Sequence, residues 1–287
     1  MAKAMRLGVL GTVAVAGALA LSGGPAMAAV SWHSSTAYTC TGGDLATGTF
    51  TSIPSGNYAS ITVKGVCNVQ PDAVINVRGN INVVPGAVFD AQSAPSTITV
   101  RHNVTAGPGS LLGLGCLPNP PGHTTGHPCT VDPTGSSDIT VKGNLTAWDA
   151  NTVLLNGIKV KGNVTLIGSE GTATAAERAN AIPWSIKDNT IGRNLIVGHM
   201  TPLWIGLLHN KVGGNVIMFD VHITDGLPPN NDPSPTIFIA SNTIGRNLVC
   251  YGLAPAVSGG FPGEVNVVGG KALGQCANLQ DVPPPPD

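Results

Sequence analysis

Short runs in which apolar and polar residues alternate recur along the chain, and each run ends in a turn rich in Gly and Asn. Four examples are INVRGN (75–80), ITVRHN (98–103), ITVKGN (139–144) and IKVKGN (158–163). Alternation with a period of two places every second side chain on one face, which is the pattern of a half-buried β-strand. No stretch keeps helical spacing long enough for a βα repeat, so the sequence predicts an all-β protein.

The second half of the chain carries a clearer repeat, N-x-[IV]-G-[RG]-[NK]. It starts at positions 189, 210, 242 and 266, which are 21, 32 and 24 residues apart, and the heptad NTIGRNL occurs twice without a change. The longest interval contains TDGLPPNNDPSP, a segment of loop composition. The related upstream turns are 23, 41 and 19 residues apart. A unit of about 19 to 24 residues therefore repeats from about Ile61 to Gln275.

These observations predict a single-stranded parallel β-helix, a β-solenoid with about 19–24 residues per coil and disulfide-stapled ends. Stacked coils bury a continuous apolar interior that one short strand cannot bury alone. We expect Gly to supply positive φ at the corners and stacked Asn side chains to hydrogen-bond along them. A β-sandwich is the rival fold, but it does not predict corners at constant phase. The expected corner residues are Asn189, Gly192, Asn194, Asn210, Gly213, Asn215, Asn242, Gly245 and Asn247.

The N-terminus has the features of a cleavable signal peptide. MAKAMR carries two cations, an apolar run follows to Leu21, and Ala26-Met27-Ala28 forms a cleavage box, with cleavage expected between Ala28 and Ala29. The sequence therefore predicts an exported protein that does not remain inserted in a membrane. The expected organisation is a signal peptide (1–28), an N-terminal cap (29–60), a solenoid (61–276) with insertions near 107–136, 168–183 and 225–235, and a disordered Pro-rich tail (277–287).

Charge is scarce in this chain. Charged residues make up 10% of the 287 residues and the formal net charge is -1, whereas an average domain has about 25% charged residues. There is no run of basic residues, so the composition gives no indication of nucleic-acid binding. No cofactor is expected.

Six cysteines behind a signal peptide predict disulfides formed in an oxidising compartment. Fifteen pairings are possible, and the spacing favours Cys40 with Cys67, Cys116 with Cys129, and Cys250 with Cys276. The outer pairs span 27 and 26 residues, close to one coil, so they would staple the two ends of the solenoid.

The segment between Cys116 and Cys129 also suggests a metal site, because His123 and His127 lie four residues apart. The interpretation that we favour is a disulfide-closed loop with two exposed histidines. Export favours thiol oxidation, and the Pro and Gly content argues against the helix on which H-x-x-x-H zinc sites are built.

Candidate catalytic residues are few. The densest cluster is FDVHITD (219–225), in which Asp220 and His222 would share a face of an extended strand and Asp225 follows them. Glycoside hydrolysis needs two carboxyl groups about 5 to 9.5 Å apart. Asp149, Glu170, Glu177, Asp188 and Asp232 are isolated in sequence, although stacking of coils would bring some acids together.

The C-terminal segment NTIGRNLVCYGLAPAVSGGFPGEVNVVGGKALGQC (242–276) resembles the tail of uncharacterised secreted β-solenoid proteins of high-GC Gram-positive bacteria, whose pattern is N-x-I-G-G-N-L-x-C followed by G-Q-C. Arg246 stands where that group usually has Gly. The resemblance implies export, a Cys250–Cys276 bridge and a solenoid tail, and that group has no established activity to carry over to this chain. GNINVVPGAVFDA (79–91) is similar to the coils of bactofilin-like proteins, and the architecture is similar to that of pectin-lyase-like parallel β-helices.

Together these features favour a secreted, non-enzymatic structural or binding protein at the cell surface or in the extracellular space. Its expected partner is a cell-wall or extracellular polysaccharide, which Trp148, Trp184 or Trp204 would contact by stacking. The alternative is a polysaccharide lyase or glycoside hydrolase of the parallel β-helix type. Ice binding is a third hypothesis, and the Thr-x-Thr segments at 49–51 and 97–99 do not recur in phase to support it.

Overall fold

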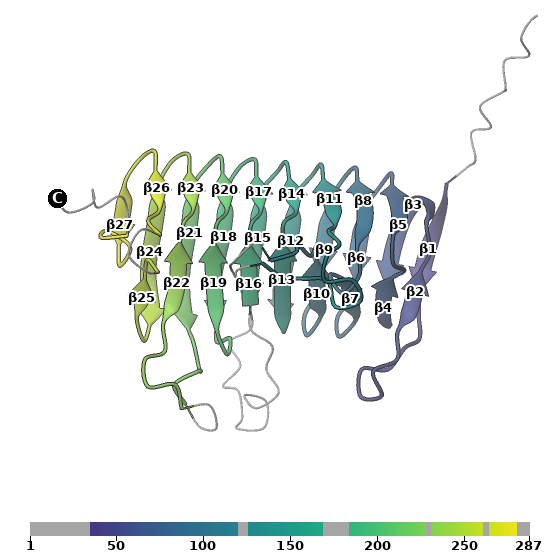
Figure 1. Ribbon diagram of the computed structural model, residues 1–287, viewed down its shortest axis with the longest axis horizontal. Helices are drawn as coiled ribbons and strands as arrows, with labels where there is room; N and C mark the ends of the chain where they lie inside the picture. The colour runs from purple at the N-terminus through teal and green to yellow at the C-terminus, as the bar shows by residue number, and fades with distance from the viewer. Residues whose placement is uncertain (1–34, 120–125, 169–183, 228–230, 261–263, 280–287) are drawn as a thin grey trace, which may run out of the picture. The chain divides into compact units, whose positions relative to one another are not determined.

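The computed structural model describes residues 35–119, 126–168, 184–227, 231–260 and 264–279. Every regular element in this part of the chain is a β-strand, and no helix occurs in it (Figure 1). The all-β prediction is therefore confirmed. The predicted signal peptide and its cleavage site lie outside the described residues.

The strands form three parallel stacks, and each repeat of the sequence contributes one strand to each stack. The first stack contains β3 (Gly56–Val63), β6 (Ile81–Val83), β9 (Val104–Ala106), β12 (Leu145–Ala150), β15 (Val164–Gly168), β18 (Leu195–Met200), β21 (Val216–His222), β24 (Leu248–Ala254) and β27 (Ala272–Gly274). The second stack contains β2 (Thr51–Ile53), β4 (Val66–Val69), β7 (Val88–Ala91), β10 (Leu111–Leu114), β13 (Thr152–Asn156), β16 (Trp184–Lys187), β19 (Ile205–Leu208), β22 (Ile237–Ala240) and β25 (Val257–Ser258).

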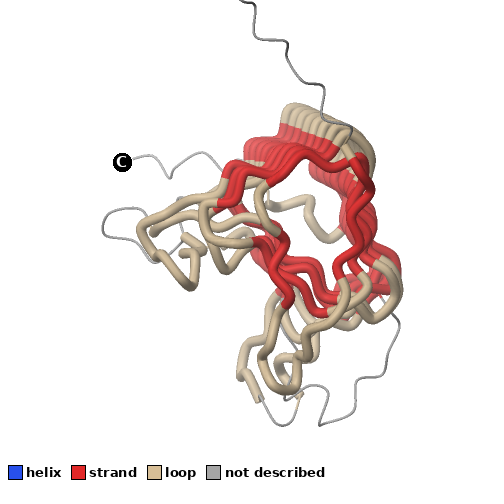
Figure 2. Tube along the Cα trace, turned by 90° about the vertical axis from the view of Figure 1, so that its right-hand side faces the viewer, coloured by secondary structure: helices blue, strands red, loops and turns tan. Residues whose placement is uncertain are grey.

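The third stack contains β5 (Ala73–Val77), β8 (Ser96–Val100), β11 (Asp138–Val141), β14 (Lys159–Val160), β17 (Thr190–Ile191), β20 (Lys211–Val212), β23 (Thr243–Ile244) and β26 (Val267–Val268). The long strand β3 pairs with β5 through its first half and with β6 through its second half, which joins the first and third stacks into one 18-stranded sheet. The second stack is a separate 9-stranded sheet. Figure 2 shows the strands of successive repeats superimposed around a common interior.

Apart from irregularities at Thr36/Ala37 and Trp148/Ala150, the register between repeats is constant, and this places equivalent residues above one another. Leu145, Val164, Leu195, Val216 and Leu248 form one such series in the first stack. All five side chains are buried. Because the side-chain period of a strand is two, a slip of one residue would expose this whole series.

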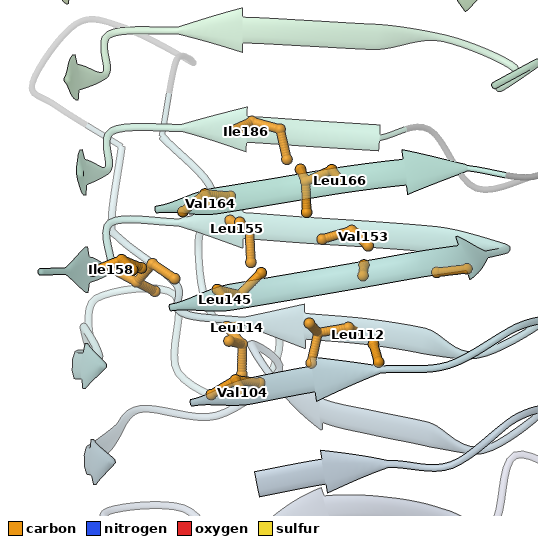
Figure 3. Close-up of a cluster of buried hydrophobic side chains, with 14 of the residues drawn as sticks. Val104, Leu112, Leu114, Leu145, Val153, Leu155, Ile158, Val164, Leu166 and Ile186 are labelled. Atoms are coloured by element: carbon orange, nitrogen blue, oxygen red, sulfur yellow. The ribbon is translucent and has the colours of Figure 1, made fainter. Parts of the chain in front are cut away.

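Apolar side chains from the three stacks meet in the interior. Figure 3 shows Val104, Leu145, Val164 and Leu166 on strands that run opposite those of Leu112, Leu114, Val153, Leu155 and Ile186, with Ile158 at the side. Each of these ten side chains is at most 1% exposed. Burying one Val, Leu or Ile side chain stabilises the fold by about 1.5–3 kcal/mol, so the alternating apolar positions of the sequence form the core.

A column of buried asparagines lies between the second and third stacks. The Nδ2 atom of Asn189 donates to Oδ1 of Asn210, Asn210 donates to Asn242, and Asn242 donates to Asn266, over 2.9 to 3.0 Å. Oδ1 of Asn210, Asn242 and Asn266 also accepts the backbone N–H of the asparagine one repeat earlier, and Oδ1 of Asn189 accepts that of Ile158. The four side chains are at most 2% exposed, and these bonds supply the partners that buried amides need.

A second asparagine column follows the third stack. The Oδ1 atom of each member accepts the backbone N–H of the next member, and the series ends at the backbone N–H of Lys271. Its members are Asn80, Asn103, Asn144, Asn163, Asn194, Asn215 and Asn247. The recurring asparagines of the sequence therefore lie at equivalent turns.

The expectation that the repeat glycines supply positive φ is wrong. Gly192, Gly213 and Gly245 are not among the residues with positive φ. The left-handed residues of these repeats lie at the preceding corner, before the third stack, and are Asp188, His209 and Ser241, with φ of 58°, 55° and 55°. Glycine is needed at Gly213 for another reason, because a Cβ there would lie 2.6 Å from the carbonyl oxygen of Gly192 in the repeat below. Close stacking of backbones selects glycine at this position.

The three predicted disulfides are all present. Cys40 is bonded to Cys67, Cys116 to Cys129 and Cys250 to Cys276. The first pair links β1 (Thr36–Cys40) to the second stack, and the last links β24 to the turn after β27. The first and last bridges therefore join neighbouring repeats near the two ends of the described chain, and Cys116–Cys129 closes a loop between β10 and β11.

Several expected boundaries differ from the observed ones. β1 and β2 pair in parallel with β3 and β4 and so extend the stacks into the region expected to be a cap. The insertion expected at 107–136 includes β10, because LLGL (111–114) supplies buried side chains to the second stack. Leu279 packs against the core beyond the boundary expected at 276.

No helix among the described residues is long and apolar enough to cross a membrane.

Candidate functional site

A hollow of about 220 Å³ lies on the outer face of the second stack, over β16, β19 and β22. Trp204 and Phe238 form its apolar floor, with ring centroids 6.0 Å apart and ring planes tilted by 40°. Gly206 allows this arrangement, since a Cβ at that position would collide with the indole ring of Trp204. Leu208 and Ala240 complete the apolar lining.

Charged and titratable side chains border the apolar floor. Lys187, His209 and Glu264 line the hollow, and Asp188 adjoins it. The Nδ1 atom of His209 lies 3.5 Å from Oδ1 of Asp188 in the neighbouring repeat. Both residues precede a repeat asparagine and have positive φ, so the same backbone feature in two stacked repeats places their side chains together.

Burial shifts the pKa values of two groups at this border. It raises the pKa of the Asp188 carboxyl above its usual range, an effect that the charges of His209 and Lys187 oppose. It lowers the pKa of the Lys187 ammonium. The Nζ atom of Lys187 donates to the backbone oxygen of Gly126 over 3.1 Å, so the disulfide-closed loop covers this lysine. A partly buried acid beside a histidine can bind or release a proton near a ligand.

A second hollow, of about 200 Å³, lies on the outer face of the first stack. Met200, Thr201, Asp220 and His222 line it. Oδ2 of Asp220 lies 2.8 Å from Nδ1 of His199, and its other oxygen lies 3.7 Å from Nε2 of His222. Asp220 therefore lies between two histidines, one on its own strand and one in the preceding repeat.

The expected catalytic cluster is only partly assembled. Asp220 and His222 are close, but not through plain strand alternation, because Asp220 has a left-handed backbone conformation (φ of 50°) between Phe219 and Val221. Asp225 is not part of this hollow. Its backbone oxygen accepts the N–H of Asp232, and its pKa is raised by burial and then by the charge of Asp232.

The metal hypothesis for the loop can be tested only at one of its histidines, because His123 lies outside the described residues. The thiols of Cys116 and Cys129 are consumed in a disulfide. His127 pairs through its backbone with Leu117, and burial lowers the pKa of its imidazole. Among the described residues, no group of three or more His, Cys, Asp and Glu side chains has the geometry to hold a metal ion.

The three tryptophans considered for stacking have different environments. Trp184 is 2% exposed and its Nε1 donates to the backbone oxygen of Asn151, so it fills the core. Trp148 is 56% exposed on β12. Trp204 is half-buried in the hollow of the second stack.

Sequence reasoning did not identify Lys187, His209, Phe238 or Glu264 as site residues. One signal was available, because His209 occupies the position before a repeat asparagine that Asp188 occupies one repeat earlier. Phe238 carried no such signal, since an aromatic residue in a strand pattern occurs equally in a core.

No protein-family model, curated protein or solved structure matches this chain.

Proposed function

We propose that the described strands form one parallel β-helix, a β-solenoid of about 19–24 residues per coil, and that the chain is exported. The parallel stacks, the constant register and the two asparagine columns support the solenoid. Three disulfides and the apolar N-terminal segment support export.

The function that the geometry supports best is glycan binding by a secreted, non-enzymatic protein. The observation that supports it is the aromatic floor of Trp204 and Phe238 bordered by polar groups. Sugar rings have apolar faces edged by hydroxyl groups, so an aromatic floor with hydrogen-bonding groups at its border is complementary to them. Glu264 and His209 would accept or donate hydrogen bonds to hydroxyl groups at the ring edge.

Retention on insoluble polysaccharide tests this function. The mature protein is incubated with cell-wall and plant polysaccharides, and Trp204→Ala and Phe238→Ala are compared with the wild type. Each variant should bind at least about tenfold more weakly, which corresponds to about 1.4 kcal/mol. Trp148→Ala is the matched control, because it removes an exposed tryptophan from a different stack. Equal weakening by Trp148→Ala, or none by Trp204→Ala, contradicts the proposal.

A second candidate function is polysaccharide cleavage at the same hollow. The raised pKa of Asp188 and the presence of Glu264 in the lining favour it, since glycosidases use one acid with a raised pKa together with a second carboxylate. Release of reducing ends or of unsaturated products from a polysaccharide panel would support this function if Asp188→Asn abolished it. Binding without product release would support the non-enzymatic function.

A further inference from the structure

The cations of this protein are gathered along one edge of the described chain. Seven lie in the turns between the third and first stacks, one in nearly every repeat; they are Arg78, Arg101, Lys142, Lys161, Arg193, Arg246 and Lys271. We call these seven the cationic row. Lys159 and Lys211 lie on the strands of the third stack that lead into these turns. Of the lysines and arginines in the described residues, only Lys64 and Lys187 lie elsewhere.

Backbone hydrogen bonds between repeats fix the row. The N–H of Arg101 donates to the oxygen of Val77, that of Lys142 to Val100 and that of Lys161 to Val141, so these cations follow Arg78 at the same position of successive turns. In the turns of Arg193 and Arg246 the cation stands one residue later and follows a glycine, and Lys271 stands one residue later again, where the other turns have asparagine. Adjacent strands are about 4.8 Å apart, so the row from Arg78 to Lys271 extends over roughly 34 Å.

All seven side chains of the row are exposed. Within the described residues, the only ion pair between a carboxylate and a lysine or arginine is Lys159 with Asp138, at 3.1 Å, and it lies beside the row. Like charges on neighbouring strands repel each other and destabilise a sheet. Repulsion between the cations of the row therefore destabilises the fold, and a bound anionic polymer would neutralise these charges and remove the repulsion.

The row is also rigid. The turns of Arg78 to Arg246 each contain an asparagine of the second column, whose Oδ1 accepts the backbone N–H of the next asparagine, or of Lys271 at the end of the series, over 2.8 to 3.2 Å. The spacing of the cations along the edge is thus set before any ligand binds. Preorganisation of the backbone strengthens binding, because only the side chains of the row remain to be ordered.

Polar hydroxyl groups accompany the row on the adjacent strands. Thr140, Lys159, Thr190, Lys211 and Thr243 occupy one outward position in successive repeats of the third stack. Threonine hydroxyls alternate there with lysine ammonium groups. The hydroxyls would hydrogen-bond to hydroxyl groups of a polymer, and the ammonium groups would pair with its carboxylates.

We propose that the cationic row binds a linear acidic polysaccharide with one carboxylate on each sugar, lying along the stacking direction of the repeats. One carboxylate per sugar gives a charge spacing similar to that of adjacent strands, so successive cations meet successive carboxylates. Single-stranded nucleic acid fits less well, because proteins bind it through aromatic side chains that stack on the bases. The turns of the row contain no Trp, Tyr or Phe.

Fluorescence titration with a labelled oligogalacturonate of about eight units, roughly the length of the row, tests the proposal. The same oligomer with its carboxyl groups reduced is the neutral probe. We expect the acidic oligomer to bind, the neutral one not to bind, and the affinity to fall as salt is raised. Equal binding of the neutral oligomer, or tighter binding of a single-stranded oligonucleotide of equal charge, would overturn the proposal.

Variants separate the row from other cations. Lys142→Gln should weaken binding several-fold, and Arg101→Gln, Lys142→Gln and Lys161→Gln combined should weaken it at least tenfold. Lys64→Gln is the matched control, because Lys64 is equally exposed but lies outside the row, and it should leave binding unchanged. Arg193→Gly is a second variant that keeps the fold, since Gly214 already occupies this position in the next repeat. If Lys64→Gln weakens binding as much as Lys142→Gln, the row is not the site.

Trp204→Ala should leave oligogalacturonate binding intact, because the aromatic hollow lies on a different stack. The proposal on the row is therefore independent of glycan binding in that hollow, and either can fail without the other.

Discussion

Nδ2 of Asn210 lies 3.0 Å from Oδ1 of Asn242, a residue 32 positions later in the chain and one repeat further along the stack. The same Nδ2 donates to the backbone oxygen of Ile186 over 2.7 Å, and Oδ1 of Asn210 accepts hydrogen bonds from the backbone N–H and from the side-chain Nδ2 of Asn189. One buried amide thus connects three successive repeats.

Replacing Asn210 with Ala should destabilise the protein by about 3 kcal/mol, because buried polar groups of Asn189 and Ile186 lose their partner and each costs about 1–3 kcal/mol. Urea unfolding measures the change in unfolding free energy. Asn215→Ala in the half-buried second column is the matched control and should cost about 1 kcal/mol. A larger loss for Asn215→Ala than for Asn210→Ala would show that burial does not set the strength of the two columns.

The sequence was informative wherever one local feature recurs at constant phase. The apolar positions around Leu145 and Leu195 predicted buried strands, and the spacing of Cys250 and Cys276 predicted their bridge. Both depend on the period of the repeat, which the sequence displays directly. The conformation of Gly213 was predicted wrongly, because the need for glycine arises from a backbone contact with another repeat.

The candidate site was harder to predict, since its residues come from different repeats. Asp188 and His209 are 21 residues apart in sequence and meet because both precede a stacked asparagine. The cationic row is similarly hidden, because Arg101 and Lys142 are separated by an insertion and no basic run marks them. Knowledge of the period alone does not say which side chains point to the same side of a turn.

Removal of the last disulfide by the paired change Cys250→Ala and Cys276→Ala should destabilise the chain by about 3 kcal/mol, because the closed loop of 26 residues restricts the unfolded state. The effect should concentrate at β26 and β27, where amide hydrogen exchange would accelerate most. The Cys116–Cys129 bridge closes a shorter loop of 13 residues, and its removal by Cys116→Ala and Cys129→Ala should leave hydrogen exchange at β27 unchanged. Uniform acceleration of exchange throughout would contradict this assignment.

The stability of the loop around His127 should depend on pH. Burial lowers the pKa of this imidazole below its ordinary value of 6.5, so the unfolded chain takes up a proton at a higher pH than the folded chain. The contribution of His127 to stability is therefore present above about pH 6.5 and is lost as the pH falls through the folded pKa. Between pH 7 and pH 4, the melting temperature of the wild type should fall more steeply than that of His127→Gln. An equally steep loss in His127→Gln would place the acid sensitivity elsewhere.

Asp188 should have the opposite dependence. Burial raises its folded pKa above the ordinary value of 3.8, so between these two values the folded chain holds more protons than the unfolded chain, and stability falls as the pH rises through that window. Asp188→Asn cannot ionise and should lack this fall, so the difference in melting temperature between variant and wild type should grow from pH 3 upward and then level off. Asp44→Asn is the control, because Asp44 lies in an exposed turn. A melting-temperature difference between Asp188→Asn and the wild type that does not change with pH would show that ionisation of this carboxyl does not destabilise the folded protein. It would also argue against Asp188 as a proton donor in the hollow of Trp204 and Phe238.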